Sequence, residues 1–219
     1  YGVNSGVLNV GDIIPADSVI LQRHIKDDPS TSNYVSAVIG KWHLGGSSPQ
    51  ASHPNDMGVD YYAGNLRGSI NDYESWPLTL NGQTNQTTTY HTTKTTDLAI
   101  DWIGAQTEPW FLWLAYVAPH SPFHLPPSSL HTQNLSGTEE DIATNPRPYY
   151  LAAIEAMDTE IGRLLSSLSQ EERDNTTILF VGDNGTPRQV ADRSIYTNGS
   201  KGNLTEGGLA VPMIASGAS

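Results

Sequence analysis

Five polar residues that could bind an anion or a metal ion come just after three apolar runs of the chain. They are Lys41 and His43 after residues 35–39, His120 after residues 110–118, and Asp183 and Asn184 after residues 177–181. Short apolar runs of this kind are typical of buried strands in a parallel sheet. In an open α/β sheet, ligands bind in the crevice beyond the carboxyl ends of the strands. We therefore expect these side chains to meet in one site.

His120 lies between Pro119 and Pro122. A lone histidine in a loop is usually only solvated, but the two prolines fix the backbone on both sides and hold the imidazole in one place. This arrangement favours a hydrogen-bond donor to an anion, or a general acid. His124 is less constrained, and we expect it behind the site or on the surface.

Asp183 and Asn184 have two interpretations. Asn184-Gly185 is a typical hairpin turn, but no alternating strand follows it. Alternatively, the adjacent carboxylate and amide supply two hard oxygen ligands, which suit Ca²⁺ or Mg²⁺. Their place at the end of an expected strand favours the metal site.

Lys41 and His43 flank Trp42. In an extended turn, residues i and i+2 point the same way, so both cationic groups would face one ligand while Trp42 packs beneath them. A glycine-bounded turn with incidental polar residues explains the segment equally well. Lys201, in a glycine-containing loop, is by itself a surface residue, and only the other motifs suggest a function for it.

The composition indicates one globular α/β domain, or a large piece of one, because 37% of its 219 residues are hydrophobic and 16% are charged. The net charge of −12 argues against a nucleic-acid partner. The chain has only 11 Lys and Arg residues, so a site for anions would have to concentrate some of these few cationic side chains. The lack of cysteine excludes disulfides, thiolate metal sites and a cysteine nucleophile within this stretch. No apolar run is long enough to span a membrane, and no signal sequence opens the chain. Its Ser, Thr and Asn content favours a periplasmic or secreted protein.

The apolar periodicity predicts alternating helices and strands, and therefore a largely parallel sheet. Expected helices cover residues 17–25, 94–103 and a segment that starts at Asn145-Pro146, and expected strands cover residues 34–39, 110–118, 177–181 and 211–215. The strand at 110–118 should be central, since it is apolar on both faces. The third helix shows a stripe of large apolar residues, which are Leu151, Ile154, Met157, Ile161, Leu164, Leu165 and Leu168. Residues 45–86 show little periodicity and are expected to form a long irregular segment.

Four motifs, in this order and spacing, make the chain resemble the formylglycine-dependent, arylsulfatase-like sulfatases of the alkaline phosphatase superfamily. They are GKWHLGG, APHSPFHLPP, VGDNGTP and KGNLTEGGLAVPMI. The resemblance extends over nearly the whole chain. It implies that residues 1–219 are a partial catalytic domain with an incomplete alkaline phosphatase-like fold, in which helices flank a mostly parallel central sheet.

The resemblance also implies roles for individual residues in the hydrolysis of a sulfate ester. Lys41 and Lys201 correspond to lysines that contact the sulfate oxygens. His43 would hydrogen-bond the hydrated formylglycine, and His120 would contact the sulfate or protonate the leaving oxygen. Lysine, histidine and metal placed in advance would stabilise the negative charge that spreads over the sulfuryl oxygens.

Asp183 and Asn184 correspond to two ligands of the family's metal ion, usually Ca²⁺, with Mg²⁺ as the alternative. The family's nucleophile motif, Cys or Ser followed by x-Pro-Ser-Arg, and an Asp-Asp pair that completes the metal site do not occur in this sequence. Both are expected upstream of Tyr1, and we expect the chain alone to be inactive. Ala210 also departs from the family, which commonly has Arg there.

Two alternatives remain open. One is a phosphatase or phosphonate monoester hydrolase of the same superfamily, against which the neutral Asn184 speaks. The other is a non-catalytic protein that binds sulfated glycans. The substrate is expected to be a carbohydrate or aryl sulfate, and Tyr73, Trp76 and Tyr90 are candidates for stacking on its ring.

Overall fold

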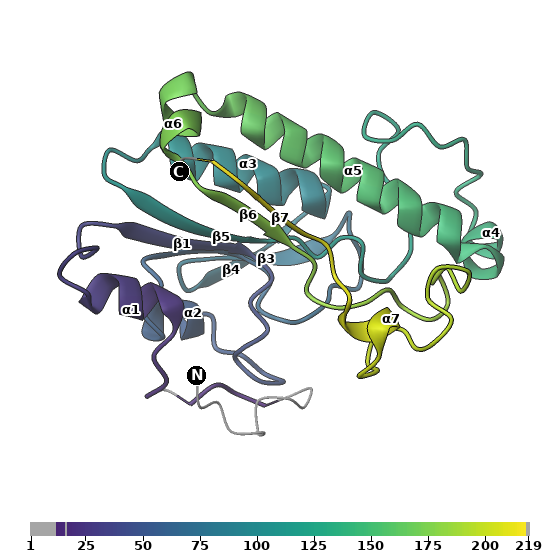
Figure 1. The fold of residues 1–219 in the computed structure, drawn as a ribbon, viewed down its shortest axis with the longest axis horizontal. Coiled ribbons are helices and arrows are strands. Elements are labelled where there is room, and N and C mark those ends of the chain that lie inside the picture. Colours follow the sequence, from purple (N-terminus) through teal and green to yellow (C-terminus); the bar gives the residue numbers. More distant parts are fainter. Residues whose placement is uncertain (1–11, 16, 218–219) are drawn as a thin grey trace. The chain divides into compact units, whose positions relative to one another are not determined.

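The computed structural model describes residues 12–15 and 17–217. The chain divides into two compact units, Tyr1–Pro122 and Phe123–Ser219. That residues 1–219 form part of one catalytic domain stays a prediction. Figure 1 traces the helices and strands of each unit along the chain.

The first unit contains a five-stranded mixed sheet in the order β4-β3-β2-β1-β5. Its strands are β1 (Val35–Gly40), β2 (Tyr61–Gly64), β3 (Trp76–Leu80), β4 (Gln83–Thr87) and β5 (Trp110–Ala115). β1 pairs in parallel with both β2 and β5, whereas β2–β3 and β3–β4 are antiparallel. The carboxyl ends of β1, β2 and β5 therefore share one edge of the sheet, and the predicted fold class, with mostly parallel central strands, is confirmed.

Helices lie on both sides of this sheet, with α3 (His91–Gly104) on one side and α1 (Leu21–Asp27) and α2 (His53–Asp56) on the other (Figure 1). α3 begins three residues before the expected start at Lys94. Threonine has a low helix propensity, but Thr95 and Thr96 are buried here, and their hydroxyls donate to the carbonyls of His91 and Thr92 at 2.8 and 3.1 Å.

The expectation of an irregular segment over residues 45–86 is wrong, because α2, β2, β3 and part of β4 lie within it. A two-residue turn joins β3 to β4 at Asn81 and Gly82, whose φ angles are 41° and 87°. Asn-Gly with two positive φ angles is the preferred connection of a tight hairpin. The hairpin signal was therefore present in the sequence, at this Asn-Gly pair.

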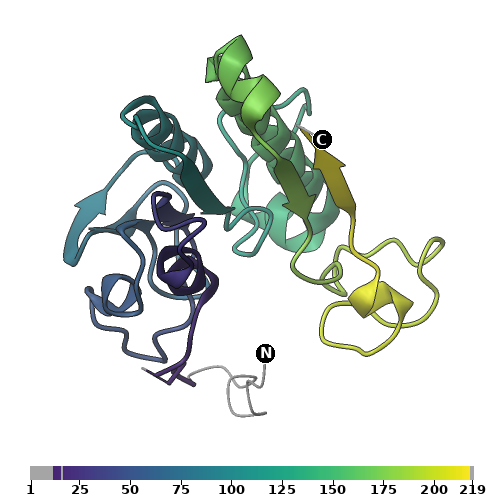
Figure 2. The ribbon, with the colours of Figure 1, turned by 60° about the vertical axis from the view of Figure 1, so that its left-hand side comes forward.

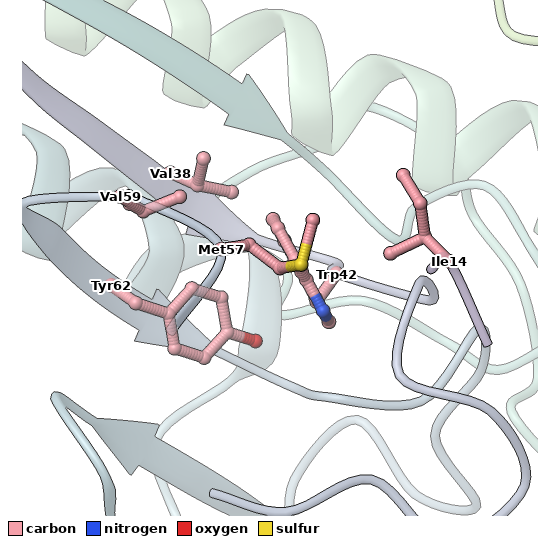
Figure 3. Packing of buried hydrophobic residues seen from close by; sticks show 6 residues of the cluster. All are labelled: Ile14, Val38, Trp42, Met57, Val59 and Tyr62. Atoms are coloured by element: carbon pink, nitrogen blue, oxygen red, sulfur yellow. The ribbon is translucent and has the colours of Figure 1, made fainter. Parts of the chain in front are cut away.

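The core of the first unit lies beneath the loop that follows β1. A cluster of buried apolar side chains gathers there (Figure 3), and its members are Ile14, Val38, Trp42, Met57, Val59 and Tyr62. The Trp42 ring meets the rings of Tyr62 and His53 edge-on. Trp42 therefore anchors the loop that carries Lys41 and His43 to the core.

β5 is the last strand of the sheet among the residues described, and not the central strand that its sequence predicts. Trp113 on this strand is 50% exposed. The strand carries no charged residue and no proline.

The second unit consists of α4 (Glu139–Thr144), α5 (Pro146–Ser167), α6 (Gln170–Asn175), β6 (Ile178–Val181), α7 (Glu206–Leu209) and β7 (Met213–Ser216). β6 and β7 pair with each other antiparallel in a separate two-stranded sheet, next to α5 in Figures 1 and 2. The strand expected to be buried at 177–181 is exposed on one face, where Leu179 and Val181 are 64% and 56% exposed, while Ile178 and Phe180 are partly buried.

α5 starts at Pro146 after the N-cap Asn145, as predicted. Its buried face differs from the predicted apolar stripe, because the buried residues are Tyr149, Ala152, Ala153, Ala156, Glu160 and Leu164. Leu151 of the predicted stripe is 43% exposed. Small alanines let neighbouring segments approach closely, so the apolar pattern of α5 does not by itself show which face is covered.

Within the described part of the chain, no helix is both long and apolar enough to cross a membrane.

Candidate functional site

The loop that carries Lys41 and His43 leaves the sheet at Gly40, the last residue of β1. Gly40 has φ of 104°, and a Cβ at this position would lie 2.0 Å from the carbonyl oxygen of Ala115 on β5. Only glycine fits this close approach. The backbone N–H of Lys41 then donates to the same carbonyl at 2.8 Å. Lys41 is therefore fixed at the edge where β1 and β5 end.

The next two residues are held by the loop after β2. Trp42 N–H donates to Asn65 O at 3.1 Å, and His43 N–H donates to Leu66 O at 3.0 Å. The Trp42 indole N–H donates to Nδ1 of His53 at 3.0 Å, and burial lowers the pKa of His53, which keeps that nitrogen available as an acceptor. Trp42 is 7% exposed, whereas Lys41 is partly exposed and His43 is exposed.

His43 has a left-handed backbone with φ of 57°, so the loop is not the extended turn that the sequence suggests. Its imidazole lies directly against the backbone of Gly68. A Cβ on Gly68 would come within 2.3, 2.4 and 2.5 Å of Cε1, Nδ1 and Nε2 of the ring. The missing side chain of Gly68 therefore makes the space that the His43 ring occupies.

His120 follows β5 in a tight turn, in which its N–H donates to Val117 O at 2.9 Å. The imidazole Nδ1 lies 2.8 Å from Ser121 O. A carbonyl oxygen can only accept, so Nδ1 carries the proton of this hydrogen bond. Nε2 is then the nitrogen that can exchange a proton with a ligand.

A chain of buried side chains connects the two loops, and the sequence did not single it out for this role. The side-chain oxygen Oδ1 of Asn65 accepts from Nε2 of His91 at 3.0 Å, and the backbone N–H of His91 donates to Tyr73 O at 2.8 Å. The Tyr73 hydroxyl donates to His120 O at 2.7 Å. Burial raises the pKa of Tyr73, so the hydroxyl keeps its proton and remains a donor.

The expectation that Tyr73, Trp76 and Tyr90 stack on a substrate ring is wrong. Their exposed fractions are 2%, 1% and 4%, and they pack inside the first unit. Spacing alone could not distinguish this role, since aromatic residues in an apparently irregular segment serve packing and binding equally well.

In the second unit, Asp183 and Asn184 follow the end of β6. The flanking backbone is fixed on both sides, because Gly182 N–H donates to Pro212 O and Gly185 N–H donates to Gly208 O, both at 3.0 Å. Neither Asn184 nor Gly185 has a positive φ, and β6 pairs with the distant β7. The hairpin-turn alternative for Asn184-Gly185 is therefore excluded.

The donor set at Asp183 and Asn184 is one carboxylate and one amide oxygen, which fits a hard cation such as Ca²⁺. Among the described residues, no group of three or more His, Cys, Asp or Glu side chains is arranged so that it could hold a metal ion. This chain would therefore contribute two ligands, and a complete coordination shell would need others.

Lys201 lies in the same loop system as this pair. Its N–H donates to the carbonyl oxygen of Thr186 at 2.9 Å, and Thr186 is two residues beyond Asn184. Lys201 is exposed. The structure thus groups Lys41, His43 and His120 in one unit, and Asp183, Asn184 and Lys201 in the other. The meeting of the two groups in one pocket stays a prediction.

Comparisons with known proteins identify the family. The family model described as Sulfatase matches residues 30–219, and the chain therefore belongs to the sulfatase family.

Human N-acetylgalactosamine-6-sulfatase is 29% identical over 231 residues, which cover 92% of this chain and 40% of that protein. The uncharacterized sulfatase YdeN of Escherichia coli K12 is 29% identical over 242 residues, 97% of this chain and 41% of that protein. The crystal structure of Ps i-CgsB in complex with k-i-k-neocarrahexaose is similar with a TM-score of 0.74 and 29% identity, over 95% of this chain and 49% of that one. The chain thus spans about half or less of the length of these relatives.

Proposed function

We propose that the protein to which this chain belongs hydrolyses sulfate esters. The observation that carries the proposal is the edge of the sheet that β1 and β5 share. There the backbone N–H of Lys41 donates to Ala115 O, and the loops that carry His43 and His120 begin. Because the chain belongs to the sulfatase family, we assign the hydrolysis of a sulfate ester to these cationic groups.

The lysines and histidines would act on three different parts of the reacting centre. The ammonium groups of Lys41 and Lys201 would bind the nonbridging sulfate oxygens, where negative charge develops during transfer. Nε2 of His120 would donate a proton to the leaving oxygen. The imidazole of His43, seated on Gly68, would hydrogen-bond the nucleophile.

A metal ion and a nucleophile would complete the site. Asp183 and Asn184 would hold Ca²⁺, with Mg²⁺ as the alternative, and the bound cation would supply positive charge next to the sulfate. The family's formylglycine would be the nucleophile, in a segment that is not among these 219 residues.

The substrate that we favour is a sulfated carbohydrate. Two of the relatives support this choice by name, since one is an N-acetylgalactosamine-6-sulfatase and another was crystallised with a neocarrahexaose.

The test is to assay the complete protein with 4-nitrophenyl sulfate and 4-nitrophenyl phosphate under the same conditions. We expect release of nitrophenol from the sulfate at a much higher kcat/KM. A preference for phosphate would establish the phosphatase alternative, and sulfated-glycan binding without turnover of either ester would establish the non-catalytic one.

Replacement of Gly68 by alanine is expected to lower kcat by about 10- to 100-fold, because a new Cβ would displace the His43 ring, and a misplacement of 1 Å can cost about 100-fold. The clash falls on the end of a side chain, so Tm should change little. Steady-state kinetics and thermal unfolding measure the two effects separately.

The matched control is Gly104→Ala, because a Cβ there meets nothing within 4 Å. It should leave kcat unchanged. Full activity of Gly68→Ala would contradict a role for the His43 ring in its present position.

A further inference from the structure

The second unit contains a cavity of about 490 Å³ in the loop between β6 and α7. Arg188, Arg193, Tyr196, Asn198 and Ser200 are among its lining residues. Cavities that bind small molecules measure about 300–1,000 Å³. The cavity is therefore large enough for a sugar ring and a charged substituent.

The charge of the cavity is opposite to that of the chain. Its lining includes two arginines and no acidic residue, in a chain with 11 Lys and Arg against 23 Asp and Glu. Neither guanidinium makes a hydrogen bond or an ion pair within the part of the chain that the structure describes. Two such arginines in the lining of one cavity favour an anion.

The nearest acid in sequence does not neutralise Arg193, because it is already engaged. Arg147 donates to the Asp192 carboxylate at 3.0 Å and also to Val190 O at 2.6 Å. The N–H and hydroxyl of Ser194 donate to the other carboxylate oxygen at 3.0 and 2.6 Å. These bonds lower the pKa of Asp192, so it stays ionised and bound to these partners.

The walls of the cavity are held by hydrogen bonds within the loop. Ser200 N–H donates to the Asn203 side chain at 3.1 Å, and the Thr205 hydroxyl donates to Asn198 O at 3.1 Å. Ser200 is followed by Lys201, whose backbone is bonded to Thr186. The cavity therefore adjoins the lysine that we assign to the reacting sulfate.

We propose that this cavity binds a second anionic group, a sulfate or a carboxylate, of the same glycan whose sulfate ester is cleaved. Arg188 and Arg193 bind the anion, and the phenol ring of Tyr196, 38% exposed, covers a face of the sugar. The proposal rests on the proposed function, and it narrows the substrate class to glycans with more than one anionic group per short segment.

The experiment compares the complete wild-type protein with Arg188→Gln, Arg193→Gln and the double variant. The substrates are 4-nitrophenyl sulfate, a monosulfated disaccharide, a disulfated disaccharide and a sulfated disaccharide with a uronic acid. Loss of a hydrogen bond to a charged group corresponds to roughly 10-fold in affinity. We expect KM to rise roughly 10-fold per arginine for the two dianionic sugars, with 4-nitrophenyl sulfate and the monosulfated sugar unaffected.

Arg173→Gln is the charge-matched control, since Arg173 is exposed on α6 in the same unit and donates to Leu168 O. It should leave all KM values unchanged. If only one of the two dianionic sugars responds, that identifies the second group as sulfate or as carboxylate. Equal losses on all four substrates, or no loss on any, would overturn the proposal.

Failure of the proposed function is distinguishable from failure of this inference. A wild-type protein that cleaves no sulfate ester would refute the function alone. Calorimetric titration with the disulfated disaccharide then tests the cavity without turnover. Weaker binding by the double variant than by the wild-type protein would support the anion site, and equal binding would refute it.

Discussion

Alanine in place of His120 should lower kcat for a sugar sulfate by about 10²- to 10⁴-fold, the usual contribution of a general acid. The loss should be far smaller with 4-nitrophenyl sulfate, because nitrophenolate is a weak base and leaves without a proton. Nδ1 of His120 is committed to Ser121 O, so Nε2 is the only nitrogen of this ring that can donate to substrate. Steady-state kinetics with the two substrates measures the difference.

His24→Ala is the matched control for this experiment, since His24 is an exposed histidine of α1 in the same unit. It should leave both rates unchanged. An equally large loss with both substrates would show that His120 contacts the sulfate and does not protonate the leaving group.

Asp183→Ala should abolish the stabilisation of the complete protein by calcium. A ligand that binds only the folded state at 100 times its Kd adds about 2.7 kcal/mol to the free energy of unfolding. The wild-type protein should therefore unfold at a higher Tm in the presence of Ca²⁺, and the variant should show the same Tm with and without it. The kcat of the variant should fall at least about 100-fold, because a bound cation contributes several kcal/mol to transition-state stabilisation.

Asp158→Ala is the control, because Asp158 is an exposed carboxylate on α5. Thermal unfolding with Ca²⁺, Mg²⁺ and chelator, followed by calorimetry, distinguishes the two ions. If Ca²⁺ and Mg²⁺ raise the Tm of Asp183→Ala as much as that of the wild-type protein, Asp183 is not a metal ligand.

The sequence was informative where one local signal determined the structure. Asn145-Pro146 predicted the start of α5, and the apolar runs predicted β1, β5 and β6 to within a few residues. The motif order predicted the sulfatase family, which the family model confirms.

The sequence was misleading where neighbours decide between equally good local patterns. The leucines and isoleucines of α5 outweigh its alanines in any apolar pattern, yet Ala152 and Ala156 are 0% exposed whereas Leu151 is 43% exposed. The α/β pattern also gave no account of the strand pairing, since β6 joins β7 and not the parallel sheet.

For the candidate site, residue type identified the groups that can react but not the groups that hold them. Lys41, His43 and His120 were visible because their chemistry is distinctive. Asn65, His91 and Gly68 were not, because their contribution depends on contacts between segments far apart in sequence. The one weak signal was His91, a histidine among threonines that proves fully buried.

The composition of β5 has a practical consequence, because β5 is the last strand of its sheet among the described residues. Strands that border water in stable proteins usually carry lysine, proline or a bulge, which discourages other chains from pairing with them. β5 has none of these charges or prolines, and β6 exposes Leu179 and Val181. These 219 residues, purified alone, would tend to assemble edge to edge into insoluble material. Kinetic and calorimetric work therefore belongs on the longer polypeptide, and light scattering should precede any measurement on the chain by itself.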